Sequence, residues 1–145
     1  MSEVRTVSFF PKLVLAGILA LSPTWASAWW AMNRHEVFPV SDGVYEVVAR
    51  VGSSASDFWC GAGDFAQRVI GLPAAERIYI WRGIGPSVNR PGRKAVQFAL
   101  TPPPGADTTA SLTLSVKAVG DNLARHAAVQ YCYQHDGDDI WRRRW

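Results

Sequence analysis

The sequence predicts an α+β domain in which a small antiparallel sheet of about five strands carries two packed helices and one disulfide. Three observations support this prediction. Segments with strand and helix patterns follow one another in the order β-β-α-β-β-β-α. The connections between the last strands are short, as antiparallel neighbours allow. Two cysteines, Cys60 and Cys132, are available for a single bridge.

The first 28 residues have the three parts of a secretory signal peptide. Arg5 and Lys12 supply positive charge, the apolar run LVLAGILAL follows, and an Ala-Ser-Ala motif ends at Ala28. The apolar run is shorter than the roughly 20 residues that a bilayer-spanning helix needs. We therefore expect cleavage after Ala28. The remaining residues 29–145 are expected to form one globular domain with a Trp/Arg-rich C-terminal tail.

Export would place both cysteines in an oxidising compartment, where the thiols of small domains usually pair. We expect a Cys60–Cys132 disulfide that stabilises the domain by restricting the unfolded chain. Arginine outnumbers lysine by 12 to 3, a usage typical of GC-rich bacterial genomes. Together these features predict a bacterial protein that is periplasmic or secreted.

The expected domain starts with a hairpin and a helix. The β-branched segment 44–51 (VYEVVARV) follows a Ser-Asp-Gly turn, and residues 37–40 can pair with it as a short edge strand. Ser56 or Asp57 is expected to cap the helix that comes next. Gly71 and Pro73 are expected to end this helix. Its buried stripe is expected to consist of Phe58, Ala62, Phe65, Ala66 and Val69.

Three further strands are predicted between glycine and proline residues, at 77–82 (RIYIWR), 95–100 (AVQFAL) and 111–119 (SLTLSVKAV). The proline-rich segment 101–109 is expected to be a loop. A second helix is expected after a cap at Asp121 or Asn122, with a strand at 129–133 as the alternative. The side of this helix that faces the core would carry Leu123, Ala127 or Ala128, Tyr131 and Cys132.

Composition excludes several function classes. The formal net charge is +3, and loss of the signal peptide lowers it only to +2. A nucleic-acid-binding protein normally presents a basic face with exposed aromatic rings, so we expect no nucleic-acid partner. The three histidines lack paired metal-ligand spacing, and prolines replace the phosphate-binding helix after Gly83-Ile84-Gly85. We expect neither a metal nor a cofactor.

Cys60 carries the one catalytic alternative, because it lies near the start of a predicted helix, where a thiolate is favoured. This placement resembles that of the nucleophile in envelope-remodelling cysteine peptidases, over a few residues only. The resemblance implies a hydrolase of amides or esters that uses Cys60 and His126. However, Asp57 and Asp64 on the same helix side would weaken the nucleophile, and Cys132 offers a disulfide partner. We therefore favour a structural cystine and a protein that is not an enzyme.

Two basic segments are candidates for binding. The first is a Gly/Pro-rich loop with Arg82, Arg90, Arg93 and Lys94, and the second is the tail, with Trp141 and Arg143. Rings and cations of this kind favour anionic interfaces. We hypothesise a non-catalytic module that binds an anionic envelope component or a protein partner, with at most peripheral membrane contact. Solubilising loop charges, or a purely structural or inhibitory domain, are the alternatives, and the sequence does not indicate an oligomeric state.

Overall fold

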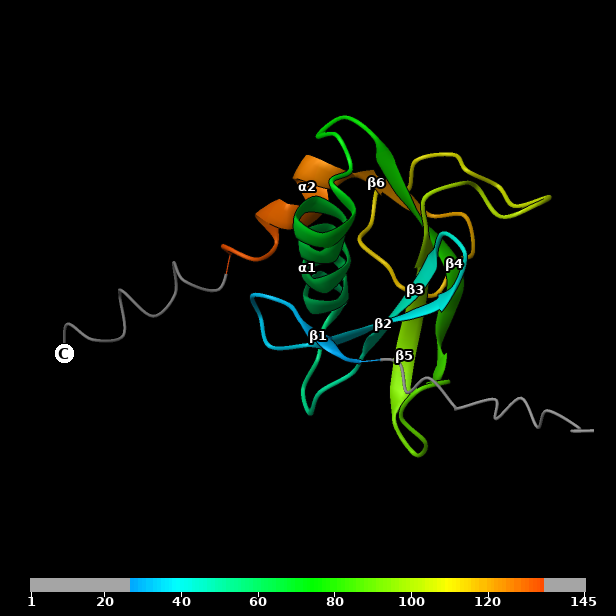
Figure 1. Ribbon diagram of the computed structural model, residues 1–145. Helices are drawn as coiled ribbons and strands as arrows, with labels where there is room; N and C mark the ends of the chain where they lie inside the picture. Colours follow the sequence, from blue (N-terminus) through cyan, green and yellow to red (C-terminus); the bar gives the residue numbers. More distant parts are fainter. Residues whose placement is uncertain (1–26, 135–145) are drawn as a thin grey trace, which may run out of the picture.

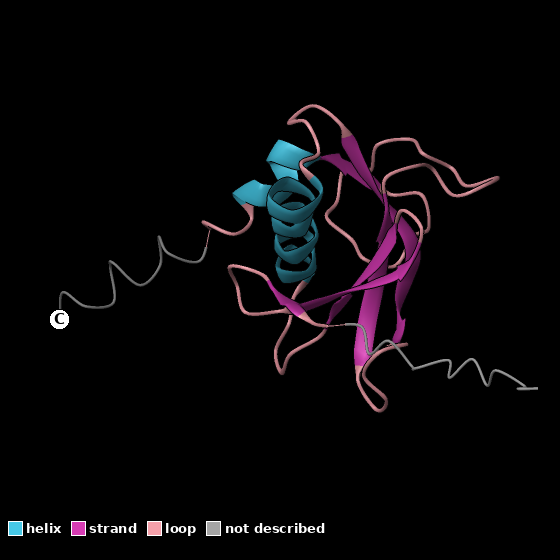
Figure 2. Cartoon of the chain, in the orientation of Figure 1, coloured by secondary structure: helices cyan, strands magenta, loops and turns pink. Residues whose placement is uncertain are grey.

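The computed structural model describes residues 27–134. These residues form one six-stranded antiparallel sheet with two helices packed on one of its faces (Figures 1 and 2). The strand order is β1-β2-β3-β5-β4-β6. The predicted α+β class is confirmed, with six strands instead of about five. The strands are β1 (Trp29–Trp30), β2 (Glu36–Ser41), β3 (Val44–Val48), β4 (Arg77–Pro86), β5 (Lys94–Ala99) and β6 (Asn122–Ala124).

The predicted hairpin is formed by β2 and β3. Their register pairs Val37 with Val47 and ends at Ser41 opposite Val44, after a bulge in β2. Gly43 closes the turn with a φ of +70°, a backbone conformation that glycine adopts without steric cost. The short strand β1, which the sequence analysis missed, adds to the outer edge of β2 by pairing Trp29 with Val37. A two-residue strand is too short for an alternating pattern to reveal.

Helix α1 (Ala55–Phe65) begins two or three residues before the predicted start, which had Ser56 or Asp57 as its cap. Ser54 is its N-cap residue, and the Asp57 carboxylate accepts a 2.7 Å hydrogen bond from the Ser54 N–H, which completes a capping box. The prediction for Val69 was wrong, because its side chain is 50% exposed. The helix widens into a π-helical segment, η1 (Ala66–Ile70), so the extra residue per turn rotates Val69 off the buried stripe.

The predicted strand at 111–119 was also wrong. This segment follows the proline-rich loop and lies beside β4 without joining a ladder. A regular ladder between this segment and β4 is not formed, because β4 is bulged between Ile80 and Gly85. Single hydrogen bonds replace the ladder, such as the 2.9 Å bond from the Ile84 N–H to the Val116 carbonyl. Leu112, part of the apparent apolar alternation, is fully exposed.

The second helix is present but starts later than predicted. Residues 122–124 form β6, which pairs with β4 from Arg77 opposite Ala124 to Tyr79 opposite Asn122. Helix α2 (Arg125–Gln130) follows directly, and residues 129–133 form no strand. Asn122 does not cap a helix, because its side-chain amide donates to the Thr108 and Gly120 carbonyls. These bonds tie the long loop to the edge of the sheet.

The main core lies between α1 and the sheet. Trp59 and Phe98 are both 1% exposed or less, and their rings meet edge to face at 5.0 Å. The Tyr45 hydroxyl, also buried, donates to the Ala62 carbonyl at 3.0 Å. The predicted Cys60–Cys132 disulfide is confirmed and joins α1 to the segment after α2.

Several predictions concern residues outside the described part of the chain. Residues 1–26 of the predicted signal peptide lie outside it, as do Trp141 and Arg143 of the predicted tail site. Within residues 27–134, no helix combines the length and apolar character needed to cross a membrane.

Candidate functional site

A pocket of about 460 Å³ lies on the face of the sheet that the helices leave uncovered. Its base is a row of residues that strand pairing brings together. Trp30 of β1 is the partner of Glu36 of β2, and the β2–β3 register continues to Val48. Paired residues of antiparallel strands point to the same face, so all three side chains line the pocket. Trp30 is 58% exposed there, whereas Glu36 and Val48 are buried.

Arg34 reaches the pocket from the tight turn between β1 and β2. Its φ of +62° lies in the left-handed region, which costs a non-glycine residue roughly 1–2 kcal/mol. The surrounding bonds hold this conformation. The Met32 N–H donates to the buried Asp64 carboxylate at 2.7 Å, and the Asn33 amide donates to the Asp57 carbonyl at 2.8 Å. Helix α1 therefore fixes the turn that presents Arg34.

Arg50 reaches the pocket from the turn after β3, and His35 connects that turn to the first one. The His35 ring is 4% exposed, with Nε2 2.7 Å from the Ser53 hydroxyl and Nδ1 3.3 Å from the Asn33 carbonyl. The Arg50 guanidinium also donates to the Asn33 carbonyl, at 3.4 Å. The two arginine-bearing turns thus share one buried network.

The pKa of His35 depends on its burial and on the charges near its ring. Burial lowers the pKa of His35 more than the hydrogen bond to Asn33 and the charge of Asp57 raise it. The positive charges of Arg50 and Arg93 lower the pKa further. Arg50 and Arg93, which come from different segments of the chain, are therefore close enough to His35 to disfavour its protonation.

Arg93 comes from the loop between β4 and β5, and buried Glu46 fixes that loop. The Glu46 carboxylate accepts hydrogen bonds of 2.7–3.0 Å from the Ser87 hydroxyl, the Val88 N–H, and both the N–H and the side-chain amide of Asn89. Burial raises the pKa of Glu46, but these bonds outweigh it and hold the pKa below its usual value. The loop is therefore anchored to the open face of the sheet.

Arg90 of the same loop is neutralised by Glu36. Its Nε and Nη2 donate to the two oxygens of the Glu36 carboxylate at 2.9 and 2.5 Å, while its guanidinium lies 5.1 Å above the Phe38 ring. This pair lowers the pKa of Glu36. Arg93 lies farther from the same carboxylate, at 3.8 Å. Both oxygens of the Glu36 carboxylate thus accept hydrogen bonds from Arg90, and Arg93 has only a long contact with this carboxylate.

The resulting charge balance makes this pocket a candidate anion site. Among residues 27–134, neither Arg34 nor Arg50 forms an ion pair, and Arg93 has only the long contact to Glu36. Three guanidiniums therefore line one pocket without a carboxylate of their own. Arginine is suited to such a site because its planar fork of N–H donors matches carboxylate and phosphate oxygens.

The structure divides the basic loop predicted from the sequence. Arg93 lines the pocket, whereas Arg90 is a structural clamp that is paired with Glu36. Arg82 donates from Nη2 to the Pro86 carbonyl at 2.5 Å and does not line the pocket. Lys94 lies at the start of β5, opposite Pro86, and does not line the pocket either. The predicted rim is therefore not one continuous site.

The residues of the alternative hydrolase do not form a catalytic pair. Cys60 is 1% exposed and its sulfur is bonded to Cys132, so it offers no thiolate in this state. His126 lies on α2, where its Nδ1 is 2.8 Å from the Ala74 carbonyl and serves to hold the loop before β4. Nothing in this geometry favours acyl transfer over a structural role for both residues.

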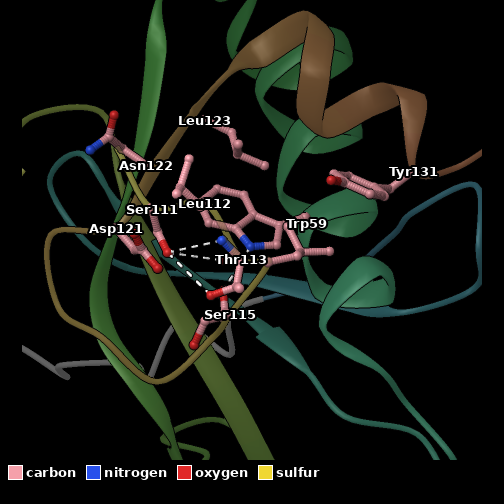
Figure 3. A pocket seen from close by; sticks show the side chains of 10 residues that line it. Trp59, Ser111, Leu112, Thr113, Ser115, Asp121, Asn122, Leu123 and Tyr131 are labelled. Atoms are coloured by element: carbon pink, nitrogen blue, oxygen red, sulfur yellow. Dashed lines mark hydrogen bonds between the residues drawn. The ribbon is translucent and has the colours of Figure 1, made fainter. Parts of the chain in front are cut away.

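A second, smaller pocket of about 100 Å³ surrounds Trp59 (Figure 3). The Trp59 indole N–H donates to the Ser115 carbonyl at 2.9 Å, and the hydroxyls of Ser111 and Thr113 lie within 3.4 Å of each other. Ligand sites usually have about 300–1,000 Å³, so this space suits little more than a few waters. Its polar groups close the long loop over the core, and we assign it no ligand.

Sequence reasoning missed Trp30, Arg34 and Arg50, although the hairpin contains the signal for two of them. Extending the register that pairs Val37 with Val47 places position 34 opposite position 50. Two arginines at the open end of one predicted hairpin therefore had to be neighbours. Trp30 could not be found in this way, because its place depends on the unpredicted strand β1.

Within the described residues, no three His, Cys, Asp or Glu side chains gather as a metal site would require. No known protein family, curated protein or solved structure matches this chain.

Proposed function

We propose that this protein is an exported, non-catalytic module that binds an anionic component of the cell envelope. The pocket lined by Trp30, Arg34, Arg50 and Arg93 is its binding site. The observation that carries the proposal is the presence of three guanidiniums around a pocket of ligand size, of which Arg34 and Arg50 form no ion pair among the described residues and Arg93 only a 3.8 Å contact with Glu36. A fourth arginine, Arg90, is neutralised beside them by Glu36, so it adds no unpaired cation to the pocket.

Rigidity supports the same proposal. Each of the three arginines comes from a turn or loop that buried groups hold in place, namely Asp64 for Arg34, His35 for Arg50 and Glu46 for Arg93. A preorganised site loses less entropy on binding than a flexible one. Localisation is part of the proposal and is supported by the signal-peptide pattern of residues 1–28. The exported form is expected to begin at Trp29, which N-terminal sequencing of the secreted protein measures directly.

Retention on vesicles of anionic lipid or on purified cell-wall material tests the binding site. The parent protein should be retained at low salt and released as salt screens the charges. Reversal of Arg34, Arg50 and Arg93 to Glu should abolish retention. A matched control reverses three cations outside the pocket, Arg82, Lys94 and Lys117, and should keep most of it. Equal loss from both triple variants would show non-specific charge attraction and would reject the pocket.

A further inference from the structure

The charge balance of the pocket also indicates the chemical class of the bound anion. This inference rests on the proposed function and makes it more specific. We propose that the pocket binds a phosphomonoester in its dianionic form, with the group that carries the phosphate lying against Trp30 and Val48.

The pocket has more positive charges than its carboxylate can balance. Glu36 is the one carboxylate in the pocket lining, and Arg90 already pairs with both of its oxygens. Arg34, Arg50 and Arg93 therefore leave an excess of three positive charges. A carboxylate or a sulfate ester brings a single negative charge, whereas a phosphomonoester at neutral pH brings nearly two.

The number of donors leads to the same ligand class. Three guanidiniums approach from three separate turns, so a ligand that engages all of them needs acceptors in three directions. A phosphomonoester has three terminal oxygens, and each can accept charge-assisted hydrogen bonds from arginine. A carboxylate has two oxygens in one plane and matches a single arginine fork best.

The apolar part of the pocket accounts for the rest of the ligand. A phosphate group alone is much smaller than the pocket volume of about 460 Å³. The remaining lining is the half-exposed Trp30 ring and the buried Val48 side chain. These surfaces suit a ring or a short apolar body attached to the phosphate, because an aromatic face gains from stacking and from removal of apolar surface from water.

Isothermal titration calorimetry with phenyl phosphate and phenyl sulfate tests the inference, since the two probes share a ring and differ in charge. At pH 7.5, phenyl phosphate should bind at least about tenfold more tightly. At pH 5, below the second phosphate pKa of about 6, this advantage should disappear. At pH 5 both probes are monoanions, so protonation of His35 or Glu36 affects both alike there, and the ratio of the two affinities reports the charge of the ligand.

Variants locate the binding site. Arg34→Gln and Arg93→Gln should each weaken phenyl phosphate binding by at least about fivefold, whereas Arg82→Gln should leave it unchanged. Trp30→Ala should weaken phenyl phosphate but leave inorganic phosphate nearly unaffected, because inorganic phosphate has no ring to stack. Unchanged binding in both arginine variants would overturn the assignment to this pocket.

A vesicle experiment distinguishes two sources of the phosphomonoester, a lipid headgroup and a soluble ligand. Vesicles with phosphatidic acid carry a phosphomonoester headgroup, and vesicles with phosphatidylglycerol at equal surface charge carry a diester. Selective retention on phosphatidic acid indicates a lipid headgroup, and binding of soluble phenyl phosphate without this selectivity indicates a free ligand. Equal affinity for phenyl phosphate and phenyl sulfate at both pH values would overturn the inference while the proposed function stands. If no anion binds and no surface retains the protein, the proposed function itself is wrong.

Discussion

Glu46 and Asn89 are joined by two hydrogen bonds to one carboxylate oxygen, from the Asn89 N–H at 2.8 Å and from its side-chain amide at 3.0 Å. A fully buried carboxylate on β3 thus replaces the water that the loop between β4 and β5 would otherwise bind. The order of this loop, and with it the position of Arg93, depends on one acidic side chain.

Replacing Glu46 should therefore loosen the loop and destabilise the fold. In Glu46→Gln the shape is kept, but an NH₂ group faces the loop donors in place of an oxygen, which leaves buried donors unsatisfied. We expect the free energy of unfolding to fall by about 2–3 kcal/mol. Urea titration measures this loss, and Glu76→Gln at an exposed carboxylate is the control. A difference between the variants of under about 0.5 kcal/mol would contradict the anchoring role.

The stability should fall in mild acid because of His35. Its pKa is lowered in the folded protein, mainly by burial, so the unfolded chain binds a proton first as the pH falls below about 6.5. The contribution of neutral His35 is complete above that pH and is lost as the pH falls through the folded pKa. Glu36 and Glu46, with lowered pKa values, add a separate loss below about pH 4.5.

Urea unfolding at several pH values between 7.5 and 5 measures this slope. His35→Gln should flatten the decline between pH 6.5 and 5 while keeping the acidic loss that Glu36 and Glu46 cause. A decline of equal slope in His35→Gln would mean that another group titrates in this range.

The disulfide should contribute strongly to stability. Cys60 and Cys132 are 72 residues apart, and closing a loop of this length stabilises the folded state by about 4 kcal/mol on the chain-entropy model. Reduction, or the double replacement of both cysteines by alanine, should lower the melting temperature markedly. The purified, unreduced protein should contain no free thiol. One or two titratable thiols before reduction would contradict a permanent bridge and restore interest in Cys60 as a nucleophile.

The predictable parts of the fold are those in which local pattern and tertiary position agree. The hairpin of β2 and β3 follows from β-branched residues on both sides of a glycine turn, and the disulfide was predicted from the presence of two cysteines and from the expected export. The helix stripe was predicted correctly up to Ala66. It failed at Val69 because the π-helical widening in η1 breaks the regular spacing, and no residue in that segment marks it.

The segment 111–119 shows the opposite case, a strand-like pattern without a strand. Leu112, Leu114 and Val116 alternate correctly, but the neighbouring edge of β4 is bulged and cannot extend a ladder to them. The candidate site was missed for a related reason. Arg34, Arg50 and Arg93 lie in three different turns, and only the register of the sheet and the anchoring by Glu46 bring them together.

Arg34 should show a conflict between stability and binding. Its left-handed backbone conformation favours glycine. The free energy of unfolding of Arg34→Gly should therefore equal that of the parent protein or exceed it by up to about 1 kcal/mol. Arg34→Ala removes the same charge but keeps the strain, and it should be less stable than the glycine variant. Both should bind phenyl phosphate weakly. If the alanine variant is the more stable of the two, backbone strain at this position is negligible.

Helix α1 approaches α2 so closely at Gly63 that a side chain there has no room. A Cβ atom on Gly63 would lie 2.8 Å from both the Ala128 Cβ and the Val129 backbone nitrogen. Alanine favours a helix over glycine by about 1 kcal/mol, but overpacking of a core typically costs about 1–3 kcal/mol. Because backbone atoms of α2 cannot rotate away, we expect the packing cost to exceed the helix gain in Gly63→Ala.

Gly61→Ala is the matched comparison within the same helix. The nearest atom there is a side-chain methyl of Val47, also at 2.8 Å, and a methyl group can shift more easily than a backbone. The free energy of unfolding measured in urea should therefore be highest for the parent protein, lower for Gly61→Ala and lowest for Gly63→Ala. The Gly63 variant should also expose the disulfide to reductant sooner, because α2 must move away from α1 next to Cys132. A Gly63→Ala protein as stable as the parent would mean that the helices can separate without cost, and that the cystine alone holds them together.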